Sequence, residues 1–182
     1  RHRQHCVEPT RGAHPGGVGE GDRGTADLAQ PGREQPDEVG ADVAKFFFLM
    51  RSSDRHLDFD LELAKQQSAD NPVYYVQMAH ARVCGIFRVG ERDPAGVTGE
   101  GIDYTQLASD EERELVKTLL GYPALVTAAA RTRSPHLVTQ YLLDTARLVH
   151  TWYHKHHVLG EAAVLQEARL TLARAAMVVL RN

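Results

Sequence analysis

One stretch of the sequence places an aromatic ring, a flexible apolar side chain and a guanidinium at helical spacing. Tyr75, Met78 and Arg82 are three and four residues apart, so a helix would carry them on one face. Such a face can stack an unpaired base and bind a phosphate. Tyr153 and His157, four residues apart in a basic segment, would form another stacking pair on a helix. The simpler interpretation is that both sets are the buried faces of a helix bundle, so the pattern leaves both interpretations open.

Four histidines near residue 150 indicate a second kind of chemistry. His150 and His154 would share a helical face and could both bind one zinc ion, with His157 as a third ligand. No carboxylate accompanies them in the pattern of a zinc hydrolase helix, which favours a partly solvated face of neutral imidazoles. We therefore predict no metal site, with a metal-binding helical protein as an alternative.

Other residues with reactive side chains have simpler explanations. Cys84 could be a nucleophile with His80 as its base one turn away, but we favour a small apolar thiol inside a helix bundle. Asp58 and Asp60 could act as paired carboxylates, or they could be solvated residues or helix caps. The glycines of segment 16–21 follow no strand pattern and precede no helix pattern, so they do not predict a phosphate loop. We predict no catalytic residue.

Composition and charge limit the class of protein. The chain has 182 residues, with 21 basic and 24 acidic side chains and a net charge of −3. This charge excludes a uniformly basic nucleic-acid surface but allows a local basic face. No apolar run is long enough to cross a membrane, and no apolar signal-peptide core is present at the start. Cys6 and Cys84 cannot form a disulfide framework, so we expect a cytoplasmic protein.

The chain changes character near residue 40. Residues 1–40 hold eight of the 15 glycines, four of the 8 prolines and no aromatic residue. Such a stretch buries too little apolar surface to offset its ordering entropy. We therefore predict a disordered segment over residues 1–38, followed by a packed domain.

Helix signals dominate after residue 40 and predict an all-α helical bundle. Asp42 is placed to cap a helix that ends near Met50. Asn71 and Pro72 mark the start of a helix that continues to about Arg88, because Asn accepts bonds from the exposed amides and proline has no N–H to satisfy. The spacing predicts that this helix buries a stripe formed by Val73, Val76, His80, Val83 and Phe87.

Two further helices are expected after a loop that contains several glycines and a proline, at 89–104. Ser109 and Glu112 form the pattern of a capping box, which opens a helix to Gly121. Pro123 is then expected to begin a separate helix, because proline disrupts a helix interior.

The C-terminal part of the chain is expected to form two long helices. Ser134 and Pro135 repeat the combination of cap and proline, and they predict a helix that continues to about Val158. Gly160 suits a left-handed helix cap, and a last helix is predicted from Glu161 to the end.

Several long segments, in the same order, resemble bacterial arginyl-tRNA synthetases. They are 39–52, 56–61, 71–82 (NPVYYVQMAHAR), 153–160 and 168–182. The resemblance covers about residues 39–182 and is highly specific, because these segments are long and keep their order. Residues 1–38 do not resemble the family, apart from the last two.

The resemblance implies a C-terminal fragment of a class I aminoacyl-tRNA synthetase, which joins arginine to its tRNA with ATP. Residues 39–70 would be the end of the catalytic body, in the part that contacts the inner side of the tRNA. Residues 71–182 would be an all-helical anticodon-binding domain, truncated at its C-terminal end.

The family pattern also implies which side chains contact the anticodon loop. By position in that pattern, five residues correspond to such contacts: Tyr75, Met78, Arg82, Tyr153 and His157. Met78 and His157 depart from the aromatic residues found in some family members.

The two ATP signatures of the family, a His-x-Gly-His turn and a Met-Ser-Lys loop, are absent from this sequence. We therefore expect a chain that is inactive alone and has no cofactor of its own, whereas the intact enzyme would use ATP and Mg. The expected partner is tRNA-Arg, with arginine and ATP bound only by the intact enzyme, no membrane contact and a monomeric state. The alternative without RNA function is a helical protein-interaction module or a metal-binding helical protein.

Overall fold

The computed structural model describes residues 39–52 and 59–181. The predicted disorder over 1–38 and the position of Asp58 lie outside the described residues. Val39–Asn182 form one compact unit, and its described residues form helices without a strand, which confirms the predicted all-α class. The helices are α1 (Ala41–Leu49), α2 (Leu61–Lys65), α3 (Pro72–Val89), α4 (Asp110–Thr132), α5 (His136–Lys155) and α6 (Ala163–Arg181), with short 3₁₀ turns η1 (Pro94–Gly96) and η2 (Tyr104–Gln106).

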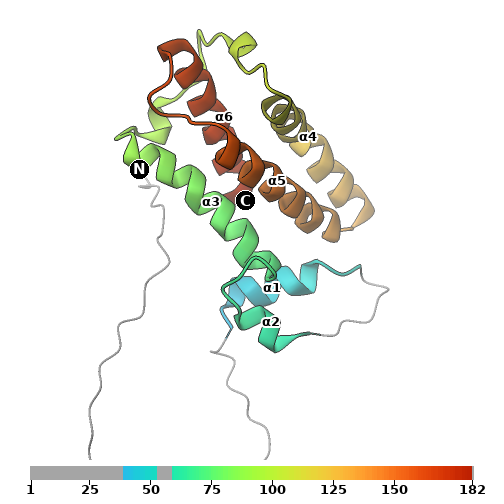
Figure 1. Ribbon diagram of the computed structural model, residues 1–182. Helices are drawn as coiled ribbons and strands as arrows, with labels where there is room; N and C mark the ends of the chain where they lie inside the picture. The colour runs from blue at the N-terminus through green and yellow to red at the C-terminus, as the bar shows by residue number, and fades with distance from the viewer. Residues whose placement is uncertain (1–38, 53–58, 182) are drawn as a thin grey trace, which may run out of the picture. The chain divides into compact units, whose positions relative to one another are not determined.

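Four long helices build the bundle (Figure 1). Helix α3 packs against α5 and α6, and α4 packs mainly against α5. The turns η1 and η2 lie in the connection between α3 and α4, and η2 contacts α6. The short helix α1 contacts α2, α3 and α5. Helices α3 and α5 are therefore direct neighbours in the bundle.

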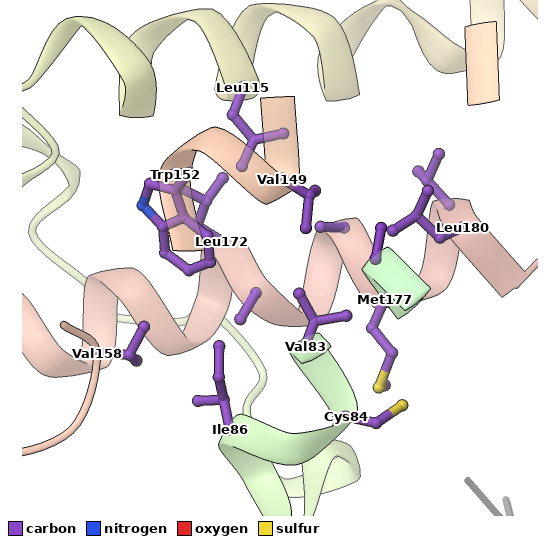
Figure 2. Close-up of a cluster of buried hydrophobic side chains, with 14 of the residues drawn as sticks. Val83, Cys84, Ile86, Leu115, Val149, Trp152, Val158, Leu172, Met177 and Leu180 are labelled. Atoms are coloured by element: carbon purple, nitrogen blue, oxygen red, sulfur yellow. The ribbon is translucent and has the colours of Figure 1, made fainter. Parts of the chain in front are cut away.

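Side chains from all four long helices meet in one apolar core. Figure 2 shows Val83 of α3 and Trp152 of α5 among residues of α6, with Leu115 reaching in from α4. Trp152 and Leu115 are fully buried. The predicted stripe of α3 is confirmed at Val73, Val76, Val83 and Phe87, which are buried, whereas His80 is half-buried. This side of α3 therefore faces the core, which leaves Tyr75, Met78 and Arg82 on a different, half-buried face.

The start of α3 follows the predicted capping chemistry. The Asn71 side-chain oxygen accepts hydrogen bonds from the amides of Val73, at 3.0 Å, and Tyr74, at 3.3 Å. Its amide nitrogen donates to the carbonyls of Ala64 and Gln66, at 3.1 and 2.8 Å. Asn71 thus both caps α3 and ties it to the end of α2.

The predicted cap of the first helix is wrong. Gly40 precedes α1, and no side chain bonds to the exposed amides. Asp42 lies inside the first turn and forms an exposed ion pair with Lys45 at 3.9 Å. A carboxylate in this turn still interacts favourably with the positive end of the helix dipole, which explains why the residue type suited the helix start.

The predicted break between Gly121 and Pro123 is also wrong, because α4 continues through both residues. An interior proline costs a helix roughly 3 kcal/mol. Packing against α5 compensates for this cost: Leu115 is buried before the proline, and the Tyr141 hydroxyl of α5 donates to the Thr118 carbonyl at 2.6 Å. Tertiary contacts therefore override the local signal.

Helix α5 is shorter than predicted. The Ser134 hydroxyl donates to the Thr132 carbonyl at 3.2 Å instead of capping the helix. The helix ends at Lys155, because His156 adopts an extended conformation with φ −126° and ψ 127°. Gly160 has the predicted left-handed conformation, with φ 83°, but it lies in the connection to α6 rather than at the end of α5. His157 is consequently not on the face of a helix.

Candidate nucleic-acid interface

Two open pockets share a ridge formed by Met78 and Arg82 of α3. The first, which we call the Leu159 pocket, has a volume of about 510 Å³ and lies between α3 and residues 153–159. The second, which we call the Tyr75 pocket, has a volume of about 440 Å³ and lies between α3, α5 and residues 67–69. Both pockets contain Met78 and Arg82 in their walls, so they adjoin each other.

The structure brings the five predicted contact residues together. Met78, Arg82, Tyr153 and His157 line the Leu159 pocket, and Tyr75 lines the other pocket with Met78 and Arg82. Tyr153 is 39% exposed, His157 is exposed, and Tyr75 is half-buried. The aromatic rings are therefore not sealed inside the bundle.

Arg82 is the polar centre of this surface. Its Nη1 atom lies 2.6 Å from His150 Nδ1 and 3.1 Å from His154 Nε2, so it donates a hydrogen bond to each ring. Its guanidinium carbon lies 5.6 Å from the centroid of the Tyr153 ring, which is a cation–π distance. Across residues 39–52 and 59–181, Arg82 forms no ion pair with a carboxylate. Within the part of the chain that the structure describes, no carboxylate therefore neutralises its positive charge.

The imidazole of His150 is held from both sides. Its Nε2 atom lies 3.1 Å from the Tyr75 carbonyl, so Nε2 carries the proton and donates, while Nδ1 accepts from Arg82. The rings of Tyr75 and His150 lie 4.4 Å apart at 57°. These contacts fix the positions of Tyr75 and Arg82 relative to each other across the interface of α3 and α5.

These contacts predict how stability depends on pH. Burial lowers the pKa of His150 from 6.5, and Arg82 and His154 lower it further, against a hydrogen bond to Tyr75 that raises it. The unfolded chain protonates this histidine as the pH falls below about 6.5, whereas the folded chain keeps it neutral. The free energy of unfolding should therefore fall with pH from 6.5 down to the lowered pKa.

Urea unfolding at about pH 7.5 and about pH 5.5 measures this dependence. The wild type should lose more stability over this interval than a His150→Gln variant, in which the titrating group is absent. Equal losses would show that His150 is not held neutral by the fold.

The same geometry argues against the metal alternative. The His150 and His154 nitrogen atoms that would face a shared ion both bond to Arg82, so a cation already lies between them. The third expected ligand, His157, lies beyond the end of α5. Among the residues that the structure describes, no three His, Cys, Asp or Glu side chains are grouped to hold a metal ion.

The remaining candidates, Cys84 with His80 and the carboxylate of Asp60, have structural positions in the fold. Cys84 is buried in the core, with its sulfur 3.7 Å from the nearer nitrogen of His80. Burial lowers the pKa of His80, and the Arg181 charge lowers it further, so this ring is neutral in the folded chain. Asp60 caps α2 by accepting a hydrogen bond from the Leu63 amide at 2.9 Å. Asp60 therefore acts as a helix cap, one of the two interpretations that the sequence left open.

Segment 131–157 has four basic side chains and one acidic side chain, but ion pairs make it less positive in the structure than this composition indicates. Arg147 forms an ion pair with Asp144 at 2.9 Å, and Lys155 pairs with Glu111 on α4. The Lys155 contact lowers the pKa of Glu111 to about 2, so the carboxylate is charged at neutral pH. Arg82 and Arg88 both line the Leu159 pocket, and Arg82 also lines the Tyr75 pocket, so Arg82 is the cation that the two pockets share.

Sequence reasoning missed the small residues that make the Leu159 pocket hollow. Ala81 and Gly85 lie on α3 beside Met78 and Arg82 and line the pocket. A Cβ atom added to Gly85 would have no heavy atom within 4 Å, so this position faces open space. The available signal was a small residue three positions after each of Met78 and Arg82.

The described helices include none that is long and apolar enough to cross a membrane.

Comparisons with known proteins agree with this architecture. The DALR anticodon binding domain family matches residues 76–182. The chain is 48% identical over 153 residues to an arginine–tRNA ligase of Desulfitobacterium hafniense, covering 82% of this chain and 27% of the ligase. It is 47% identical over 152 residues to an arginine–tRNA ligase of Halorhodospira halophila, covering 82% of this chain and 26% of the ligase.

A solved structure shows the same relationship. A crystal structure described as an arginyl tRNA synthetase from Campylobacter jejuni has a TM-score of 0.63 and 25% identity, covering 80% of this chain and 33% of that chain. The predicted resemblance to arginyl-tRNA synthetases is therefore confirmed, although the chain spans only about a quarter of the length of the curated ligases that it matches. The chain belongs to the DALR anticodon-binding domain family.

Proposed function

We propose that this chain binds the anticodon loop of tRNA-Arg through the ridge of Met78 and Arg82 and the two pockets beside it. The observation that carries the proposal is the convergence of Tyr75, Arg82 and Tyr153 from two helices on one accessible surface. Loop bases are unpaired and can be splayed out, so they are recognised by stacking and by hydrogen bonds to their edges. Two adjoining hollows beside exposed rings suit such bases.

The charge distribution supports the same proposal. Arg82 donates to the rings of His150 and His154 and lies over the Tyr153 ring, and none of these contacts is an ion pair, so its guanidinium retains a full positive charge. A phosphate that approaches the ridge can accept a charge-assisted hydrogen bond, which is stronger than the bond to a neutral imidazole. The RNA backbone would therefore lie along the ridge while its bases enter the pockets.

The intact protein is proposed to be an arginine–tRNA ligase that consumes ATP with Mg and acts as a monomer in the cytoplasm. The similarity to arginine–tRNA ligases supports this activity, and residues 39–70 would belong to the end of its catalytic part. The chain alone is expected to be inactive. Arginine-dependent exchange between ATP and pyrophosphate by the purified chain would contradict this expectation.

A filter-binding titration tests the proposed RNA partner. The chain should bind unmodified tRNA-Arg more tightly than an RNA of equal length with a scrambled anticodon loop, and the affinity should fall with increasing salt. Equal affinity for both RNAs would leave only non-specific electrostatic binding and would contradict the proposal. No binding to either RNA would favour the protein-interaction alternative.

Filling the Leu159 pocket should weaken RNA binding without damaging the fold. Glycine is a poor helix former, so replacing Gly85 with leucine should stabilise the helix by about 0.5–1 kcal/mol. The leucine side chain would enter the pocket. Loss of one stacked base is worth about 1–3 kcal/mol, so Gly85→Leu should lower the affinity for tRNA-Arg about tenfold.

The matched control for this variant is Gly121→Leu. Gly121 is exposed on α4, and an added Cβ atom there also meets no heavy atom within 4 Å. Circular dichroism should show both variants to be helical, and only Gly85→Leu should bind RNA more weakly. Equal affinities for the two variants would place the RNA elsewhere.

A further inference from the structure

One wall of the Leu159 pocket has no helix to support it. Helix α5 ends at Lys155, and residues 156–159 cross from there toward α3 in a non-helical conformation. Val158 is buried, and the Leu159 side chain packs closely on Gly90. A Cβ atom added to Gly90 would lie 2.9 Å from Leu159 Cδ2. The shape of the pocket thus depends on what holds this segment in place.

Arg169 of α6 holds residues 156–159 in place. Its Nη1 atom donates to the His157 carbonyl at 2.6 Å, and its Nη2 atom lies 3.4 Å from His156 Nδ1. Nη1 also lies 3.4 Å from a carboxylate oxygen of Glu161, further along the same connection. The guanidinium therefore contacts two residues of this segment and one residue that follows it.

The other edge of the guanidinium is anchored in the bundle. Arg169 Nε donates to Glu112 Oε1 at 2.7 Å, and the Glu112 side chain is only 1% exposed. The second carboxylate oxygen of Glu112 accepts from the Ser109 amide at 3.0 Å, which closes the capping box of α4. Arg169 therefore connects the start of α4, which the capping box fixes, to the wall of the Leu159 pocket.

We infer that Arg169 is a positioning residue for the RNA site, which acts through residues 156–159 and does not touch the RNA itself. The inference rests on the proposed function. The planar fork of arginine can bond Glu112 and the His157 carbonyl at once, whereas a lysine ammonium is a single point charge that cannot span both. Arg169→Lys should therefore keep the buried charge pair but release the pocket wall.

Arg174→Lys is the matched control. Arg174 lies on the same helix and also donates to a backbone carbonyl, that of Val97, but Val97 belongs to the connection between α3 and α4 and lines neither pocket. The two variants make the same chemical change and each loosens one loop. The amides of His156 and Gly160, at the two ends of the segment, bond to the Trp152 carbonyl and to the Gln166 side chain, and their hydrogen exchange should become faster only in Arg169→Lys.

The decisive experiment measures tRNA-Arg affinity and this exchange for the full chain and both variants. Arg169→Lys should bind about tenfold more weakly than the wild type, whereas Arg174→Lys should bind like the wild type. If the wild type binds and both variants bind equally well, or if only Arg174→Lys shows faster exchange at the His156 and Gly160 amides, Arg169 does not position the site. A wild type that does not bind RNA overturns the proposed function, and this inference with it.

Discussion

Replacing Arg169 with alanine should lower the free energy of unfolding by about 3–5 kcal/mol, the cost of breaking a buried ion pair. Arg169 and Glu112 have side chains that are 10% and 1% exposed, at 2.7 Å from each other. Burial raises the pKa of Glu112, but the bonds from Arg169 and Ser109 outweigh this effect and lower it, so the carboxylate is charged. Without Arg169, a charged carboxylate would stay in the interior without its partner.

The matched control is Arg92→Ala. Arg92 and Glu167 also form a bidentate pair, at 2.8 and 3.1 Å, but their side chains are 40% and 35% exposed. Solvent-accessible ion pairs contribute little to stability, so Arg92→Ala should change the free energy of unfolding little. Urea unfolding of both variants at neutral pH gives the comparison. Similar losses in the two variants would mean that the Glu112 pair is no more important than a surface pair.

Replacing Arg82 with alanine should lower the affinity for tRNA-Arg by about 10- to 100-fold, because a charge-assisted contact contributes about 1.5–3 kcal/mol. The variant removes a charged donor, the cation–π contact with Tyr153 and the bonds to His150 and His154. Arg82 is half-buried outside the apolar core, so the helical content should be unchanged. The dependence of affinity on salt should also become weaker by about one phosphate contact.

Two further variants make this second prediction specific. Arg82→Lys keeps the charge but loses the planar fork, so its affinity should lie between the wild type and Arg82→Ala. Arg113→Ala removes an arginine from the exposed side of α4, away from both pockets, and should bind RNA like the wild type. If Arg82→Ala binds no more weakly than Arg113→Ala, only the net charge of the chain matters.

Local chemistry explains which parts of the fold were predictable from sequence. Asn71 caps α3 and Ser109 with Glu112 caps α4 as predicted, because each cap uses groups within three residues. The continuity of α4 through Pro123 was not predictable, since it depends on packing against α5, where Tyr141 bonds to the Thr118 carbonyl. The end of α5 depends in the same way on a distant residue, Arg169.

The candidate site was predictable only where its members share a helix. Tyr75, Met78 and Arg82 were grouped by their spacing, and all three line the Tyr75 pocket in the structure. His150 and His154 lie 68 and 72 residues after Arg82, so their bonds to it left no signal in the sequence. His157 lines the Leu159 pocket, but through an extended segment and not through the helical face that was expected.

Photo-crosslinking tests the central claim most directly. A tRNA-Arg transcript with 4-thiouridine in the anticodon loop is bound to the chain, irradiated and digested, and the crosslinked peptides are sequenced by mass spectrometry. We predict crosslinks in residues 74–88 of α3 or 150–159 of α5 and its following segment, and fewer of them in Arg82→Ala. Crosslinks confined to α4 or α1 would contradict the assignment of the anticodon site to the ridge of Met78 and Arg82.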